Sequence, residues 1–387
     1  MARWYQNLSW SILRWTFCKN LTRKYNIEVI RKNPEPDPPF FLVANHAHLS
    51  DPFIIGQFME NTVNYMANVD EVTLMKRLFS DFAGAFPKRK GMADMSSIKH
   101  TFKLIRGGHV VGIFVEGDRS WDGETEPIIE GVISIISKLK VAVRLANVTG
   151  GYLSYPRWAE TKRRGKIIVE FRTISKKDVV SLSKDELSEK VTKILYRNDL
   201  KDPRMEKVVF RGKRLAHGIE NLLWLCPSCG IHDSLYGEGD IIICRGCGRE
   251  WGIDGNQRIN PGEAFGGDLK DWNDWQKSRI RELVAQKNKK PLTISKNVGL
   301  FEKIDGDEVS LGEGDLSLYE DRILFSPREK IEEIIFENPF VRDYIDNFNR
   351  NFQFNYKNKR FKIYFGNQNS CKWIFFLRHL HARSRIR

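Results

Sequence analysis

Residues 40–51 read FFLVANHAHLSD, and residues 110–120 read VVGIFVEGDRS. Each stretch is a short apolar run that ends in polar residues able to carry chemistry. Short apolar runs of this length, bounded by polar or turn residues, are typical of buried strands in α/β proteins. Residues 140–147 (KVAVRLAN) and 165–172 (GKIIVEFR) have the same character, and residues 92–106 before Gly107 indicate a helix between two of these strands. We therefore predict an α/β domain, with a mostly parallel or mixed sheet covered by helices.

Length and composition limit the classes of protein that the chain can be. The 387 residues, 41% of them hydrophobic, suggest two or three domains with real cores and exclude wholesale disorder. No run of about 18 apolar residues occurs, so we expect no membrane-spanning helix, and no secretory signal is recognisable. A formal net charge of +14 favours an anionic partner such as nucleic acid, an acidic bilayer or a phosphorylated substrate. The chain has only six cysteines, too few for a disulfide scaffold, and this usage indicates a reducing cytosol.

The N-terminal segment, residues 1–32, is predicted to be an amphipathic helix at a membrane interface. Apolar residues recur at helical spacing, and basic residues are interleaved with them. The apolar set is Trp4, Leu8, Ile12, Trp15, Cys18 and Leu21, and the basic set is Arg3, Arg14, Lys19, Arg23 and Lys24. A helix docked on its own domain is the alternative interpretation. Residues 33–39, NPEPDPP, then end any regular structure.

The composition changes near residue 225, where paired cysteines predict a zinc ribbon over residues 222–256. Two C-x2-C units, each followed by a glycine, are separated by 14 residues. This spacing is typical of a four-cysteine tetrahedral zinc site, which would be structural because no coordination position stays open. The predicted ligands are Cys226, Cys229, Cys244 and Cys247. A redox dithiol is the alternative.

Residues 262–290 are predicted to form a helical linker, and residues 291–387 a mainly β module. The β module shows alternating strands and then an amphipathic helix over residues 370–379. It resembles a small pleckstrin-homology or GRAM-like barrel closed by its last helix. That resemblance implies a lipid headgroup site, and a generic β-domain is the alternative.

His46 and Asp51 follow the first apolar run at the spacing of a histidine and its orienting carboxylate. If the strand ends at Ala44 and a helix begins near Ser50 or Asp51, the carboxylate lies close to the imidazole. Such a carboxylate fixes the tautomer, and the other ring nitrogen then accepts a proton. Asp51 before Pro52 is also a good helix start, which is the structural alternative.

Two further segments suit the binding of an anion. In residues 114–120, a glycine and Arg119 at the end of a strand would let a phosphate approach backbone amides beside a guanidinium. An ordinary turn with a surface ion pair is the alternative interpretation. Residues 84–89 form a basic loop, GAFPKR.

In this order, the three segments resemble the motifs of the glycerolipid acyltransferase family, of the 1-acyl-sn-glycerol-3-phosphate acyltransferase type. The Asn-His-x4-Asp block is matched by Asn45, His46 and Asp51, and the basic block by Arg89. The Phe-Pro-Glu-Gly-Thr-Arg-Ser block is matched except that Val115 and Asp118 replace proline and threonine. The resemblance covers about residues 1–215 and implies an acyltransferase domain over residues 33–215.

The resemblance implies a mechanism and a set of partners. His46, held by Asp51, would deprotonate a glycerol hydroxyl that attacks the thioester of acyl-CoA or acyl-carrier protein. Substrate-binding residues would be Asn45, Arg89, Glu116, Gly117 and Arg119. The acceptor would be a lysophosphatidic acid-like lipid, or else glycerol-3-phosphate or another lysophospholipid. We expect a peripheral protein on the cytoplasmic face of a membrane, in contact with anionic lipid. A zinc-ribbon nucleic-acid-binding protein with a degenerate enzyme domain is the rival class, against which the intact His46 and Asp51 argue.

Overall fold

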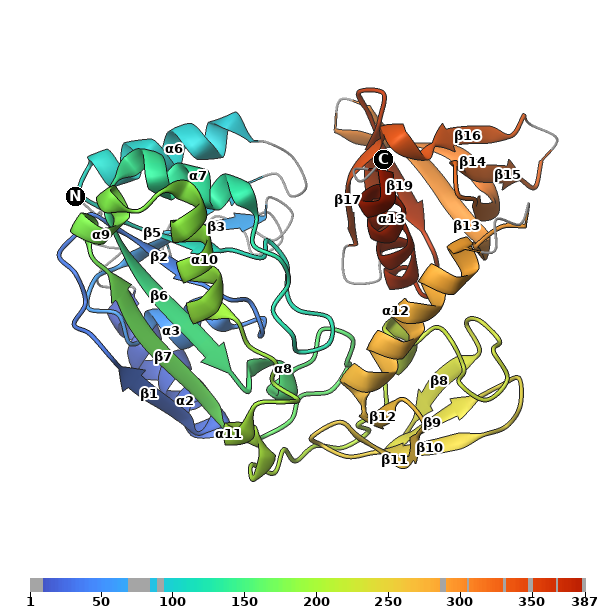
Figure 1. Cartoon of the computed structure of the whole chain (residues 1–387), viewed down its shortest axis with the longest axis horizontal. Coiled ribbons are helices and arrows are strands. Elements are labelled where there is room, and N and C mark those ends of the chain that lie inside the picture. Colours follow the sequence, from blue (N-terminus) through green and yellow to red (C-terminus); the bar gives the residue numbers. More distant parts are fainter. Residues whose placement is uncertain are drawn as a thin grey trace. The chain divides into compact units, whose positions relative to one another are not determined.

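The structure is a computed structural model that describes residues 10–68, 84–88, 94–285, 290–304, 306–329, 332–346, 351–366 and 368–384. The chain divides into two compact units. The first consists of residues 1–157 and 162–212, and the second of residues 158–161 and 213–387 (Figure 1).

The first unit is built on a mixed seven-stranded sheet. Its strands, in spatial order, are β1 (Ile27–Arg31), β7 (Ile167–Ile174), β6 (Ala142–Thr149), β2 (Phe40–Ala44), β5 (Val110–Phe114), β3 (Val63–Asn68) and β4 (Phe86–Lys88). Neighbouring strands are parallel except β6 and β7, which are antiparallel. The four strands predicted from their apolar runs are thus β2, β5, β6 and β7.

Helices cover both faces of this sheet (Figure 1). One apolar core joins the sheet to α6 (Met95–Arg106), α7 (Glu130–Leu139), α9 (Lys176–Ser181) and α10 (Lys184–Leu195). The other joins it to α2 (Lys19–Tyr25) and α3 (Asp51–Gly56). The alternation of residues in β2 explains this division, because Phe41 and Val43 belong to the first core while Phe40 and Leu42 belong to the second. Two short helices, α8 (Gly151–Ser154) and α11 (Pro203–Glu206), complete the unit.

The N-terminal helix differs from the single amphipathic helix predicted for residues 1–32. The π-helical turn η1 (Arg14–Cys18) leads into α2, which ends at Tyr25, and Ile27–Arg31 is a sheet strand instead of helix. Asn26, with φ 44°, ends the helix in the left-handed conformation. Pairing with β7 stabilises the extended conformation of this β-branched segment. Trp4, Leu8 and Arg3 lie outside the described residues.

The predicted apolar face of this helix is divided between the core and solvent. Cys18 and Leu21 are buried, whereas Ile12 is 58% and Trp15 76% exposed. Arg14 points back to its own domain and donates to the carbonyl oxygens of Gly56, at 3.3 Å, and Met59. One side of the N-terminal helix is therefore docked on its own domain, as in the alternative interpretation. The other side leaves apolar residues exposed.

The second unit begins with the cysteine-rich segment and ends with the β module. η2 (Ile219–Asn221) precedes an antiparallel sheet, and α12 (Leu269–Ala285) follows it. That sheet has the order β12 (Gly266–Asp268), β11 (Arg258–Glu263), β10 (Glu250–Ile253), β9 (Ile241–Cys244) and β8 (Leu235–Glu238). Trp158 also belongs to this unit: it is buried, and its carbonyl accepts from Asn221 Nδ2 at 3.2 Å.

The β module is a second antiparallel sheet followed by the helix α13 (Cys371–Ser384). Its order is β16 (Ile334–Glu337), β15 (Arg322–Pro327), β14 (Asp307–Leu318), β13 (Thr293–Ile304), β19 (Lys359–Tyr364), β18 (Phe352–Tyr356) and β17 (Val341–Asp346). The 3₁₀ turn η3 (Asn338–Phe340) joins β16 to β17. The predicted fold class, an α/β domain followed by a cysteine ribbon and a mainly β domain, is confirmed. Among the described residues, none of the helices has both the length and the apolar character needed to span a membrane.

Candidate active site and metal site

The two motifs that follow apolar strands meet at one edge of the sheet. β2 and β5 are parallel neighbours, with Ala44 opposite Phe114, so their carboxyl ends coincide. The N–H of Val115 donates to the carbonyl oxygen of Ala44 at 3.1 Å. This is the edge at which open α/β sheets bind ligands.

His46 and Asp51 are in direct contact. Nδ1 of His46 lies 2.9 Å from Oδ2 of Asp51, and the same oxygen accepts from the N–H groups of Ala47 and His48, both at 2.8 Å. Asp51 is wholly buried at the start of α3. With Nδ1 donating to the carboxylate, Nε2 of His46 is the nitrogen left to accept a proton. The ring stacks on Phe114, with centroids 4.2 Å apart.

Residues 114–120, the third motif along the chain, bind the backbone of His46 on both sides. Oε1 of Glu116 accepts from the His46 N–H at 2.6 Å, and the Ser120 N–H donates to the His46 carbonyl at 3.0 Å. The other oxygen of Glu116 accepts from the Glu126 N–H at 2.8 Å. Burial raises the pKa of Glu116 well above its ordinary value, although these backbone bonds act in the opposite direction. Glu116 therefore joins the two motif loops through its carboxyl group.

Asn45 holds the ends of two strands together. Its side-chain amide donates to the Val148 carbonyl at 2.9 Å and its oxygen accepts from the Val148 N–H at 2.7 Å. The side chain thus replaces a pair of sheet hydrogen bonds beyond the last residue of β2. Gly117 has φ +69°, a left-handed conformation that favours glycine in this turn.

Arg119 lies in a buried cluster of charged and aromatic side chains. Its guanidinium is 5.8 Å from the centre of the Tyr155 ring, and burial followed by repulsion from Arg157 lowers its pKa to about 10. Asp118, one of the two residues that depart from the family motif, forms an ion pair with Arg157 at 2.7 Å. A buried guanidinium that remains protonated near neutral pH suits an anionic ligand.

His48 is buried beside His46 in a different environment. Its Nδ1 accepts from the N–H of Ser50 at 2.9 Å, and burial lowers its pKa to about 4. Its ring lies edge-on to Tyr25, 5.1 Å away. The His48 imidazole is therefore uncharged near neutral pH and buried inside the loop of residues 45–51.

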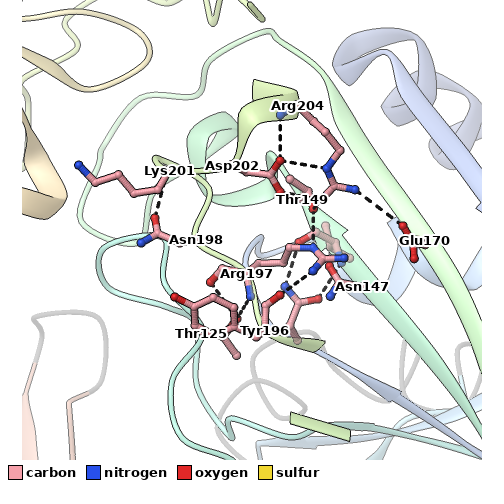
Figure 2. A network of polar contacts seen from close by, with 12 residues as sticks. Thr125, Asn147, Thr149, Glu170, Tyr196, Arg197, Asn198, Lys201, Asp202 and Arg204 are labelled. Atoms are coloured by element: carbon pink, nitrogen blue, oxygen red, sulfur yellow. Dashed lines mark hydrogen bonds and ion pairs between the residues drawn. The ribbon is translucent and has the colours of Figure 1, made fainter. Parts of the chain in front are cut away.

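A polar network fixes the loop that follows the third motif (Figure 2). Thr125 exchanges two hydrogen bonds with the backbone of Arg197, its N–H donating and its hydroxyl accepting, both at 2.8 Å. The guanidinium groups of Arg197 and Arg204 both donate to the Thr149 hydroxyl, at 3.1 and 2.9 Å. Glu170 lies 3.8 Å from Arg204. The network ties the loop at Thr125 to the end of β6 at Thr149.

Arg89, the predicted residue of the basic block, lies outside the described residues. The structure also brings in residues that the sequence analysis missed, chiefly Arg157 and Tyr155. Neither belongs to a motif, and the only signal for Arg157 in the sequence is that Asp118 needs a cationic partner.

The four predicted metal ligands converge in the second unit. The sulfur atoms of Cys226, Cys229, Cys244 and Cys247 all lie within 4.8 Å of one another. The distance is 3.9 Å from Cys226 to Cys247 and 3.7 Å from Cys229 to Cys244. Four thiolates around one zinc at about 2.3 Å would be about 3.8 Å apart, whereas a disulfide joins its sulfurs at about 2.05 Å. The cluster could therefore hold a metal ion.

The turns that carry these cysteines have the expected conformation. Gly230 and Gly248, which follow the two C-x2-C units, have φ of +71° and +73°. Their N–H groups donate to the carbonyls of Cys226 and Cys244 at 3.0 and 2.9 Å. Each knuckle is thus a tight turn closed by a left-handed glycine.

Two of three comparisons with known proteins gave matches. No curated protein matches the chain. The chain is similar to the crystal structure of the 1-acyl-sn-glycerophosphate (LPA) acyltransferase PlsC from Thermotoga maritima, with 19% identity and a TM-score of 0.41 over 49% of this chain and 78% of that chain. The family model described as Acyltransferase matches residues 22–145, which include His46, Asp51 and residues 114–120. Residues 22–145 thus match the acyltransferase family model, which covers both motif segments of the first unit.

Proposed function

We propose that the chain is a glycerolipid acyltransferase. It would move an acyl chain from acyl-CoA or acyl-carrier protein to the free hydroxyl of a lysophosphatidic acid-like acceptor. The observation that carries this proposal is the contact of 2.9 Å between His46 and Asp51 at the same sheet edge as the buried Arg119. A general base with its orienting carboxylate, next to a cation, suits a phosphorylated alcohol.

The reaction proceeds by direct transfer in this proposal. Nε2 of His46 takes the proton of the acceptor hydroxyl as its oxygen attacks the thioester carbon. The carbon–sulfur bond then breaks, and the thiolate leaves with the proton that His46 returns. Products are the ester and the free thiol, so the histidine ends in its starting state. Holding both reactants in place supplies much of the rate, and the buried carboxylate stabilises the imidazolium that forms.

The acceptor's phosphate would bind Arg119 and the turn at Gly117, together with Arg89 from the basic block. Asn45 and Glu116 would act differently from the predicted contact with substrate. Because their side-chain oxygens are already bonded to backbone N–H groups, they would support the two motif loops.

Zinc is the metal that best suits the four thiolates, and it would be structural. Four sulfur ligands complete a tetrahedral site, which leaves no position for a substrate. The residues that would hold it are Cys226, Cys229, Cys244 and Cys247.

The exposed side of the N-terminal helix would contact an anionic membrane surface. Trp15 and Ile12 project from it, and Nζ of Lys19 lies 5.0 Å from the Trp15 ring. Phe17 packs edge-on to Phe53 of α3, 5.2 Å away, so this surface adjoins the helix that Asp51 begins. An aromatic and basic surface of this kind suits lipid headgroups.

Acyl-transfer assays test the proposal. The purified chain is given labelled acyl-CoA or acyl-carrier protein and a panel of acceptors, namely lysophosphatidic acid, other lysophospholipids and glycerol-3-phosphate. We expect ester formation with the first acceptor and its loss by two to four decades in His46→Ala. Turnover by His46→Ala at the wild-type rate, or no product from any acceptor, would contradict the proposal.

A further inference from the structure

Arg157 makes three contacts with the turn that carries Arg119. Its NH1 nitrogen forms the 2.7 Å ion pair with Oδ2 of Asp118 and donates to the carbonyl oxygen of Arg119 at 3.0 Å. Its guanidinium also lies 3.8 Å from the centre of the Trp121 ring. The Arg157 side chain is 0% exposed, whereas that of Asp118 is 28% exposed, so the cation of the pair is buried and the carboxylate is partly open to solvent.

The negative charge of Asp118 explains why the three contacts of Arg157 matter for ligand binding. A carboxylate next to an anion-binding guanidinium would compete with the ligand for it and repel the ligand itself. Oδ2 of Asp118 pairs with Arg157, and Oδ1 accepts a hydrogen bond from the backbone N–H of Arg119 at 2.9 Å. Arg157 offsets the negative charge, so the three residues together carry a net charge of +1.

We propose that Arg157 is a positioning residue for Arg119: it neutralises Asp118 and holds the Arg119 backbone, and thereby keeps the site selective for an anionic acceptor. This inference rests on the proposed function only in assigning a phosphate to Arg119. It accounts for the aspartate in the third motif, because Asp118 and Arg157 act as a compensating pair. Arg157 itself does not touch the reacting atoms.

The pair makes a distinctive prediction for variants. Arg157→Met removes the 2.7 Å ion pair with Asp118 and one positive charge from the cluster, so affinity for a phosphorylated ligand should fall by about tenfold or more. Adding Asp118→Thr to Arg157→Met removes the uncompensated charge and should restore most of the affinity, a positive coupling between two residues in contact. Kinetically, Arg157→Met should raise KM for the acceptor more than it lowers kcat.

A matched control comes from another buried arginine of the same unit. Arg144 donates to the carbonyls of Asn33 and Pro34 and lies 5.0 Å from the Phe171 ring, away from the motif loops. Arg144→Met removes a similar set of contacts. It should lower the melting temperature without changing affinity for the phosphorylated ligand.

Equilibrium binding separates this inference from the proposed function. Lysophosphatidic acid and glycerol-3-phosphate are titrated into the wild-type chain, Arg119→Met, Arg157→Met, the double variant and Arg144→Met, with melting temperatures measured in parallel. Support requires wild-type binding that Arg119→Met abolishes, Arg157→Met weakens and Asp118→Thr rescues. Unchanged affinity in Arg157→Met, no rescue, or no wild-type binding overturns the inference. If binding follows the expected pattern but no acyl transfer occurs, the proposed function fails and the inference stands.

Discussion

His46 and His48 are two residues apart, yet their environments separate them chemically. The His46 side chain is 20% exposed and bonded to the buried carboxylate of Asp51, so its second nitrogen can exchange a proton with substrate. His48 is enclosed by Tyr25 and Tyr155 and accepts a backbone hydrogen bond. A low dielectric around His48 disfavours its charged form. Burial, not residue type, therefore decides which histidine suits general-base catalysis.

Asp51→Asn tests the orienting role of the carboxylate. An amide keeps an acceptor for the N–H groups of Ala47 and His48 but carries no charge to stabilise the imidazolium of His46. We expect the rate of acyl transfer to fall by two to four decades, in the range found for general-base catalysis, with the melting temperature little changed. Initial rates at saturating acceptor, beside circular dichroism, measure this. A rate within a few-fold of wild type would remove Asp51 from the mechanism.

His48 should make folding stability depend on pH. Its pKa is about 4 in the folded chain and 6.5 as an ordinary value, so as pH falls the unfolded chain binds a proton first. The stability that neutral His48 contributes is complete above pH 6.5 and is lost as pH falls towards 4. The loss is at most about 3 kcal/mol.

The comparison with His48→Asn isolates this effect from other titrating groups. Asparagine can accept the Ser50 N–H and does not titrate. The stability difference between wild type and variant, from denaturant unfolding, should therefore shift in favour of the variant between pH 7 and pH 4.5. Parallel stability curves would contradict the assignment.

At this scale the sequence predicted the residues next to strand ends and missed the rest. The family resemblance implied that residues 45–51 and 114–120 act together, and the structure places them at the carboxyl ends of parallel neighbouring strands. Arg157 comes from a loop beyond β6, and nothing in its neighbours marks a contact with Asp118. Such long-range contacts depend on how a loop packs, which local patterns do not record.

Among the elements, the N-terminal helix shows why a periodic pattern is ambiguous. Helical spacing of apolar residues requires a partner for the apolar side but does not say whether that partner is protein or lipid. In the structure, Leu21 belongs to the core that α2 and α3 form with the sheet and Cys18 is buried, while Ile12 and Trp15 are exposed. Arg14, predicted on the polar side, instead bonds to the carbonyls of Gly56 and Met59.

The exposed pair should govern binding to anionic vesicles. Burying a tryptophan and an isoleucine in the interface contributes several kcal/mol, at roughly 1.5–3 kcal/mol for each large apolar side chain. We expect Ile12→Ser/Trp15→Ser to reduce co-sedimentation at least tenfold. Val209→Ser, at a residue 64% exposed elsewhere on the unit, should have no effect. Equal binding by all three proteins would mean that the anchor lies elsewhere.

The cysteine ribbon should depend on its metal. Thiolate–zinc bonds supply most of the folding free energy of so small a unit, so removing the metal should unfold it locally. Elemental analysis should find about one zinc per chain. Chelation or Cys226→Ser should expose Trp251, which is buried, and red-shift the tryptophan fluorescence. A metal-free chain of unchanged fluorescence and heat stability would contradict a structural zinc site.

For the whole molecule, the sequence predicted the class of each layer but not its connectivity. The order β1-β7-β6-β2-β5-β3-β4 places the first strand beside the last, a pairing between residues 140 positions apart. Apolar runs identify strands because buried strands consist mainly of apolar residues. The runs do not indicate which strands are neighbours in the sheet. The predicted strands of the β module likewise leave their order open.

The formal net charge of +14 also has a measurable consequence. At low salt the chain should bind DNA and RNA weakly and without preference, because phosphates attract any basic surface. Such binding should collapse between 50 and 200 mM salt, by several decades if about six or more phosphates are contacted. Binding in a filter assay that survives this range with sequence preference would favour the rival nucleic-acid function.

Residues 158–161 have a consequence for any attempt to isolate the catalytic half. They leave the first unit one residue after Arg157, pack with the second, and return at Lys162. Trp158 and Glu160 are held there by bonds to Asn221 and His217. A polypeptide cut after residue 212 would keep His46 and Asp51 but lose the second-unit residues that bond to Trp158 and Glu160. Such a fragment should be less stable to heat and more prone to aggregation than the whole chain.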